Sequence, residues 1–114
     1  MKIVGLKLPE NCTLTFHANG IDVRVSLNVE KDLLPWLPAE RIHKGTMFVY
    51  WIRDTIPLEY CSPKNICSMY NILLKRAMIR VREAKERRLR TEIRYFEELH
   101  NQLKLEFDES IDQR

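Results

Sequence analysis

The sequence is poor in the residues from which small proteins build catalytic and ligand-binding sites. It has three glycines, three histidines and three cysteines in 114 residues. The glycines are too far apart for a glycine-rich phosphate loop, and no serine lies in a nucleophile elbow. No histidine has a cysteine or carboxylate at the spacing of a metal site. We therefore expect a protein that is not an enzyme and that needs no metal or cofactor.

The three cysteines, Cys12, Cys61 and Cys67, do not have the pattern of a disulfide or zinc framework. Their number is odd, and Cys61 and Cys67 are farther apart than the cysteines of a zinc knuckle. Reduced thiols are the simplest interpretation. Cys61 is the best candidate for a reactive thiol, because it lies just before an expected helix whose N-terminus favours a thiolate.

Long apolar runs are also missing. Residues 1–9 contain two lysines and only short apolar stretches, which is unlike a signal peptide. No other stretch approaches the roughly 20 apolar residues of a membrane-spanning helix. We expect a cytoplasmic protein that does not bind membranes.

The first half of the chain has the alternation of a β-hairpin. Every second residue from 21 to 29 is apolar, which predicts a strand with one buried face. The dipeptide Asn19-Gly20 just before it favours a tight turn, with residues 12–18 as the partner strand.

That turn also predicts which residues face one another across the hairpin. With Asn19-Gly20 as a two-residue loop, Cys12 lies opposite Leu27 in the core and His17 lies opposite Asp22 on the other face.

Two more segments, residues 2–8 and 46–53, are rich in β-forming residues. With the hairpin strands 12–18 and 21–29 they predict a small antiparallel sheet of about four strands. A long or bent helical element over residues 63–110 follows. The expected fold class is therefore α+β.

Segment 32–44 lies between two of the expected strands and is apolar at its start. Pro35 and Pro38 exclude a regular strand across them. Either this segment is a flap that covers the sheet, or its Trp36 is an exposed anchor for a partner, since buried aromatic residues dominate interface energies.

The helical prediction for the second half starts at Ser62-Pro63. Serine caps a helix N-terminus and proline suits its first position. No glycine or proline follows Pro63, and the remaining residues are mostly strong helix formers. A single unbroken helix would be roughly 75 Å long and would project beyond a compact domain.

The apolar residues of this half form two stripes at helical spacing. The first comprises Ile66, Tyr70, Leu73, Ala77, Val81 and Ala84. The second comprises Leu89, Ile93, Phe96, Leu99, Leu103 and Phe107. At about 100° per residue the second stripe is rotated roughly 100° from the first. Either the helix breaks or bends in the charged segment 84–92, so that its second part packs on something other than the sheet, or it continues and its two parts contact different partners.

The second stripe, with His100 as its polar member, has the spacing of a short coiled-coil seam. Two interpretations are open: self-association through this seam, or folding back onto the same chain. The residues that we expect at a protein interface are Leu89, Ile93, Phe96, Leu103, Phe107 and Trp36.

Charge changes sign along the helical half. Residues 75–90 carry a net charge of +6, and residues 91–114 a net charge of −4. The basic segment can pair with itself, as Glu83 with Arg87 and Glu86 with Arg90. It can also pair with the acidic segment of an antiparallel second chain, or bind nucleic acid.

A nucleic-acid interface would use Arg76, Arg80, Arg82, Arg87, Arg88 and Arg90. These arginines fall all round the helix, and no aromatic nucleic-acid signature accompanies them.

The layout predicts one domain over residues 1–114, with a β-rich half at 1–61 and a protruding helical half at 62–112. Our first hypothesis is a non-catalytic binding protein: an adaptor, an assembly subunit or an inhibitor of a larger protein machine. Its partner would be another protein or a second copy of the chain. The alternative is a nucleic-acid-binding regulator that uses residues 75–90.

Overall fold

A β-hairpin opens the part of the chain that the structure, a computed structural model, describes: residues 7–45 and 47–112. Its strands are β1 (Cys12–His17) and β2 (Gly20–Asn28), which pair antiparallel. The apolar residues of β2, Ile21, Val23 and Val25, are buried, as the alternation predicts.

The predicted register of this hairpin is wrong by two residues, because Cys12 lies opposite Val25 and the loop consists of residues 18 and 19. A shift of two keeps each side chain on its predicted face, so Cys12 is still buried. The register is shifted because of a contact that the hairpin makes with another strand. Gly20 belongs to β2, where it has a φ of 150° and lies directly against the carbonyl group of Ile56.

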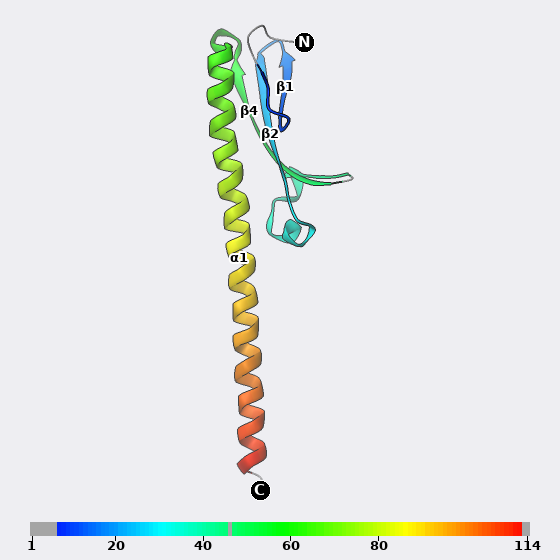
Figure 1. Cartoon of the computed structure of the whole chain (residues 1–114), viewed down its shortest axis with the longest axis vertical. Coiled ribbons are helices and arrows are strands. Elements are labelled where there is room, and N and C mark those ends of the chain that lie inside the picture. Colours follow the sequence, from blue (N-terminus) through cyan, green and yellow to red (C-terminus); the bar gives the residue numbers. More distant parts are fainter. Residues whose placement is uncertain (1–6, 46, 113–114) are drawn as a thin grey trace.

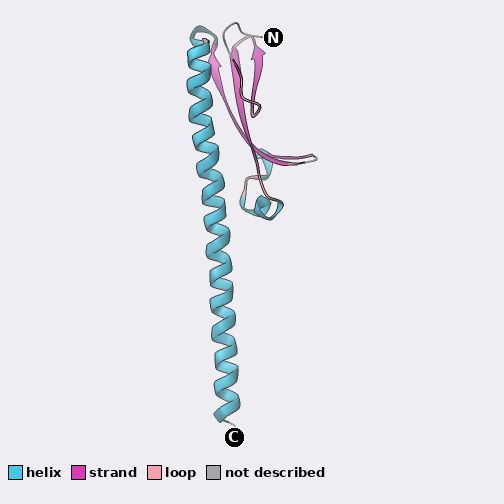
Figure 2. Cartoon of the chain, in the orientation of Figure 1, coloured by secondary structure: helices cyan, strands magenta, loops and turns pink. Residues whose placement is uncertain are grey.

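The sheet has four strands in the order β1-β2-β4-β3, all antiparallel (Figure 2). Strand β4 (Phe48–Pro57) runs farther than the predicted 46–53, because it pairs with β2 along the whole length of β2. The predicted strand 2–8 falls mostly on residues outside the described part, and Lys7 and Leu8 lie in no strand.

The edge strand β3 (Ile42–Lys44) was not predicted, because its three residues are too few to show a period. It ends the flap, whose two 3₁₀ helices span Lys31–Trp36 and Ala39–Arg41. Leu33 and Leu37 of the flap are buried. A third 3₁₀ turn, Leu58–Tyr60, follows β4.

Helix α1 (Pro63–Asp112) is a single element, which confirms the long helix and the continuous alternative (Figure 1). Ser62 caps its start: the Oγ of Ser62 accepts a hydrogen bond of 3.1 Å from the backbone N–H of Asn65. Together the sheet and the long helix confirm the α+β class.

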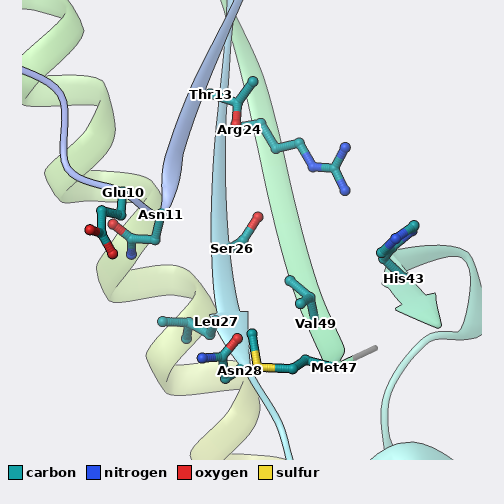
Figure 3. A pocket seen from close by; sticks show the side chains of 10 residues that line it. All are labelled: Glu10, Asn11, Thr13, Arg24, Ser26, Leu27, Asn28, His43, Met47 and Val49. Carbon is teal, nitrogen blue, oxygen red and sulfur yellow. The ribbon is translucent and has the colours of Figure 1, made fainter. Parts of the chain in front are cut away.

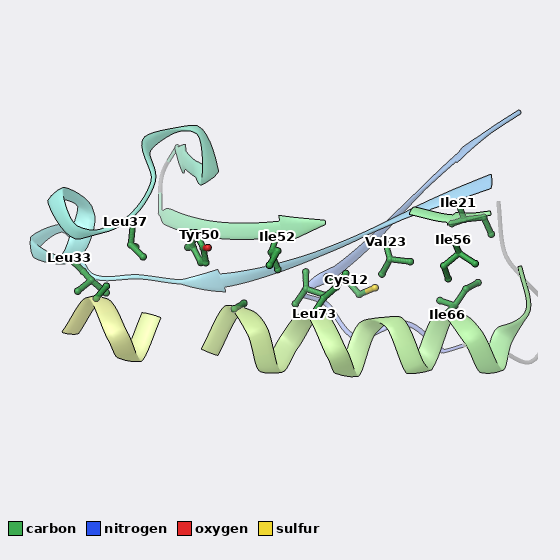
Figure 4. Packing of buried hydrophobic residues seen from close by; sticks show 13 residues of the cluster. Cys12, Ile21, Val23, Leu33, Leu37, Tyr50, Ile52, Ile56, Ile66 and Leu73 are labelled. Carbon is green, nitrogen blue, oxygen red and sulfur yellow. The ribbon is translucent and has the colours of Figure 1, made fainter. Parts of the chain in front are cut away.

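The core lies between one face of the sheet and the first stripe of α1 (Figure 4). Ile66, Leu73, Ala77 and Ala84 are at most 1% exposed. They pack against the inward residues of β2 and β4, among them Val23 and Ile52. The first stripe therefore has the role that its spacing predicts.

The helix is much longer than the sheet that it covers (Figure 1). The molecule measures 82 × 26 × 22 Å, and its radius of gyration is 22.5 Å. A compact protein of this size has a radius of gyration of about 13–14 Å. Among the side chains of α1 that the structure describes, up to residue 109, the last buried one is Ala84, so the second half of the helix extends away from the core.

Gly20→Ala tests the close approach that sets the hairpin register. A Cβ at this position would overlap the carbonyl oxygen of Ile56, and the positive φ adds backbone strain. We expect the free energy of unfolding to fall by about 2–3 kcal/mol, measured by denaturant titration. Gly45→Ala is the matched control, since its Cβ would meet only the movable side chain of His43; an equal loss in both variants would contradict this account.

Candidate protein-interaction surface

The second stripe of α1 is exposed along its whole length. The exposed fractions are 55% for Leu89, 48% for Ile93, 63% for Phe96, 38% for Leu99, 56% for Leu103 and 65% for Phe107. Every side chain from residue 89 to residue 109 is exposed. The alternative in which this part folds back onto the same chain is therefore wrong, because nothing in the described part of the chain covers it.

Two arginines mark the point where the sheet and flap end along the helix. Nη2 of Arg87 donates a 3.0 Å hydrogen bond to the carbonyl oxygen of Trp36. Arg88 lies 3.6 Å from the carboxylate of Glu30. These contacts replace the expected pairing of Arg87 with Glu83. They hold the flap against the helix just beyond Ala84.

Trp36 is half-buried, so it is neither a core residue nor a free anchor. It lies beside the start of the second stripe, in a hollow between the flap and α1. The hollow is lined by Asp32, Trp36, Arg88, Thr91, Glu92, Tyr95 and Phe96. The structure thus brings Trp36 and Phe96 to the same surface.

A second hollow lies on α1 itself and is lined by Ile93, Phe96, Glu97, His100 and Asn101. The first four stand at i, i+3, i+4 and i+7, the four-residue diamond that receives one side chain of a partner helix in a coiled coil. His100 therefore forms part of this hole.

Ile72 and Ile79 are further exposed apolar residues nearer the N-terminus of α1, and the two-stripe prediction does not include them. They are 47% and 43% exposed, and they precede Ile93 by three and two heptads. A search for a seven-residue period, in place of two separate stripes, would have found them.

The six candidate nucleic-acid residues do not form one basic face. Arg76 lies 4.0 Å from Asp54, and Arg82 lies 4.0 Å from Glu86. Arg87 and Arg88 contact the flap, as described above. Among the described residues Arg80 and Arg90 make neither an ion pair nor a side-chain hydrogen bond, and the predicted pair of Glu86 with Arg90 is not formed there.

The outer face of the sheet holds a hollow of about 570 Å³ between β1, β2 and the β3–β4 end (Figure 3). Its ionisable side chains come from separate elements: Glu10 from before β1, Arg24 from β2 and His43 from β3. Beside the hollow, the Arg24 guanidinium lies 4.3 Å from the ring centre of Trp51. Across residues 7–45 and 47–112, no three His, Cys, Asp or Glu side chains form a possible metal site.

None of the three cysteines lines the hollows described above on the outer face of the sheet and on α1. Burial raises the pKa of the Cys12 thiol, and Cys67 raises it further. Cys61 is half-buried, and its Sγ–H donates to the carbonyl oxygens of Ile56 and Pro57, at 3.4 and 3.3 Å.

Asp22 is the centre of a polar cluster on the outer face. Its Oδ1 accepts hydrogen bonds from Thr55 Oγ1, at 2.5 Å, and from Nε2 of His17, at 2.9 Å. The bond from Thr55 and then that from His17 lower the pKa of Asp22, and the charges of His17 and Arg53 add to the effect. The predicted contact of His17 with Asp22 is confirmed, although the shifted register makes it diagonal.

Asp22→Asn tests this cluster through the pH dependence of stability. A lowered folded-state pKa contributes stability above the ordinary value of 3.8, and that stability is lost as the pH falls through the folded-state value. We expect the variant to lose stability at neutral pH and to unfold less steeply with acid. Urea titrations from neutral to acidic pH measure this, with Asp108→Asn on the exposed helix as the control. An unchanged acid slope would contradict the role of Asp22.

Comparison with known proteins finds no matching family, no matching characterised protein and no matching solved structure. In the portion that the structure describes, no helix is both long and apolar enough to cross a membrane. The feature that stands out in this chain is the exposed seam of α1.

Proposed function

We propose that this protein is a non-catalytic binding protein that acts through the exposed seam of α1. The seam is the set Leu89, Ile93, Phe96, Leu103 and Phe107, with Trp36 beside its start. The observation that carries the proposal is the exposure of these large apolar side chains on a rigid helix that its own sheet does not reach.

The size and form of this surface support a helical or groove-shaped protein partner. Contiguous apolar patches on a soluble protein mark interaction sites. Residues at i, i+3, i+4 and i+7 are the anchors with which a helix enters a groove or a coiled coil. A small sheet domain that presents such a helix suits an adaptor, an assembly subunit or an inhibitor of a larger machine.

Nucleic acid is the weaker candidate. Four of its six candidate arginines contact Asp54, Glu86, Glu30 or the flap backbone. A helix that binds a phosphate backbone needs a basic stripe free to face it.

The triple variant Leu89→Gln, Phe96→Gln and Leu103→Gln tests the seam. Glutamine keeps helix propensity and removes the apolar anchors. We expect the affinity for a protein partner to fall at least about 30-fold, since roughly 2 kcal/mol is a typical loss for interface anchors. Affinity purification from an extract of the native cells, with the bound proteins quantified, measures the loss.

The matched control is Leu58→Gln with Leu105→Gln, which changes two equally exposed residues that lie off the seam. Each purification is repeated after nuclease treatment. Partners that survive nuclease and vanish only with the seam variant support the proposal. Equal retention by the seam and control variants, or loss of all partners on nuclease treatment, would refute it.

A further inference from the structure

We infer that the seam of α1 pairs with the seam of a second copy of the chain, antiparallel, with Ile93 of one copy beside Phe96 of the other. This inference rests on the proposed function and names its partner. The charged residues that flank the seam carry it.

The seam has a regular heptad assignment. Position a is held by Ile79, Glu86, Ile93, His100 and Phe107. Position d is held by Arg82, Leu89, Phe96 and Leu103. The apolar part of this seam runs from Leu89 to Phe107 and covers just under three heptads, and Arg82 and Glu86 continue its a and d positions with charged side chains. Antiparallel pairing places each a residue beside a d residue of the other copy.

In the inferred register, every charged pair that flanks the seam is favourable. Positions e and g lie beside a and d, and in antiparallel helices e faces e and g faces g. Arg90 then faces Glu97 of the second copy, Glu83 faces its Lys104, and Lys85 faces its Glu106. Each pair occurs twice by symmetry, and within the described part of the chain none of these six residues makes an ion pair of its own.

A register one heptad away pairs Leu89 with Phe107 and has the more apolar seam. It also sets Arg90 against Lys104, Glu97 against its own symmetry mate and Glu92 against Glu106. Like charges at these positions oppose pairing. The charges therefore select against the register that apolar contact alone would favour.

The other arrangements are also less favourable. A parallel pair would set Lys85 against Arg90 and Glu92 against Glu97. A shift by one heptad in the opposite sense places Leu89 beside Ile93 of the second copy, and it sets Arg90 against its own symmetry mate and Glu83 against Glu97. The inferred register is the one in which the basic and acidic segments of α1 meet.

Two positions of the seam hold charged residues, Arg82 and Glu86, and the inferred dimer leaves both with favourable contacts. Arg82 and Glu86 lie near the ends of the paired region, and they are 4.0 Å from each other along the helix. Arg82 faces Phe107 of the second copy, whose ring can receive the guanidinium.

The fold leaves room for this partner. The core residues Ala77 and Ala84 lie at position f, on the side of α1 that faces the sheet. At about 100° per residue, the seam is centred roughly 130° from that side. The hole between Ile93, Phe96, Glu97 and His100 is level with Ile93 of the second copy. Leu99 of that copy lies level with Glu92, next to the hollow that Trp36 lines.

Lys104→Glu separates the arrangements. In the inferred register it opposes Glu83 of the second copy, and we expect the dimer dissociation constant to rise about tenfold at low salt. In the more apolar register it would face Arg90 and tighten the dimer. In a parallel pair it would face Leu99 and change little. Sedimentation equilibrium of the full chain measures the constant, and Arg94→Glu, which makes the same charge change away from the seam, is the control.

Adding Glu83→Lys to Lys104→Glu restores an opposite pair, and we expect it to recover the wild-type constant. A wild-type chain that stays monomeric, a tighter or unchanged dimer with Lys104→Glu, or no recovery in the double variant would overturn the inference. A monomer whose triple seam variant still loses its protein partners would overturn this inference and leave the proposed function standing.

Discussion

The contact between the first stripe of α1 and the sheet determines the rest of the molecule. Ala77 and Ala84, both fully buried, let the helix approach the strands closely, and Ile66 and Leu73 fill the space nearer its start. This contact fixes the rotation of a helix that has no break. Because the rotation is fixed near Ala84, the direction of every later side chain is fixed too, and the seam has to face solvent.

The charges of the helix divide between two tasks. Arg87 and Arg88 reach back to Trp36 and Glu30 and hold the flap beside the helix. Arg76 does the same for the end of β4 through Asp54. The residues at the flanks of the seam take no part in such contacts. The net charge of segment 75–90 therefore does not identify what the segment binds. The positions of its individual charged residues are more informative.

Much of this structure follows from short-range patterns, and the failures have long-range causes. Alternation over residues 21–29 gave the correct buried face, and helix-forming composition with the Ser62 cap gave the correct helix. The hairpin register was wrong because Gly20 serves a contact with Ile56, thirty-six positions along the chain. The arginine contacts to the flap were missed for the same reason. The exposed stripe was predicted, since spacing defines it, but its exposure depends on where the sheet ends.

Apolar contact and charge have different consequences along the seam. Leucine, isoleucine and phenylalanine side chains pack against one another in several registers, so burial favours association without choosing an alignment. Each exposed ion pair contributes little free energy. A shift of the register by one heptad, however, replaces pairs of opposite charge by pairs of like charge. A helix with His100, Arg82 and Glu86 in its seam gives up part of the apolar contact. In the inferred dimer the flanking charges discriminate among alignments, so the proposal is of a weak and salt-sensitive association of defined geometry.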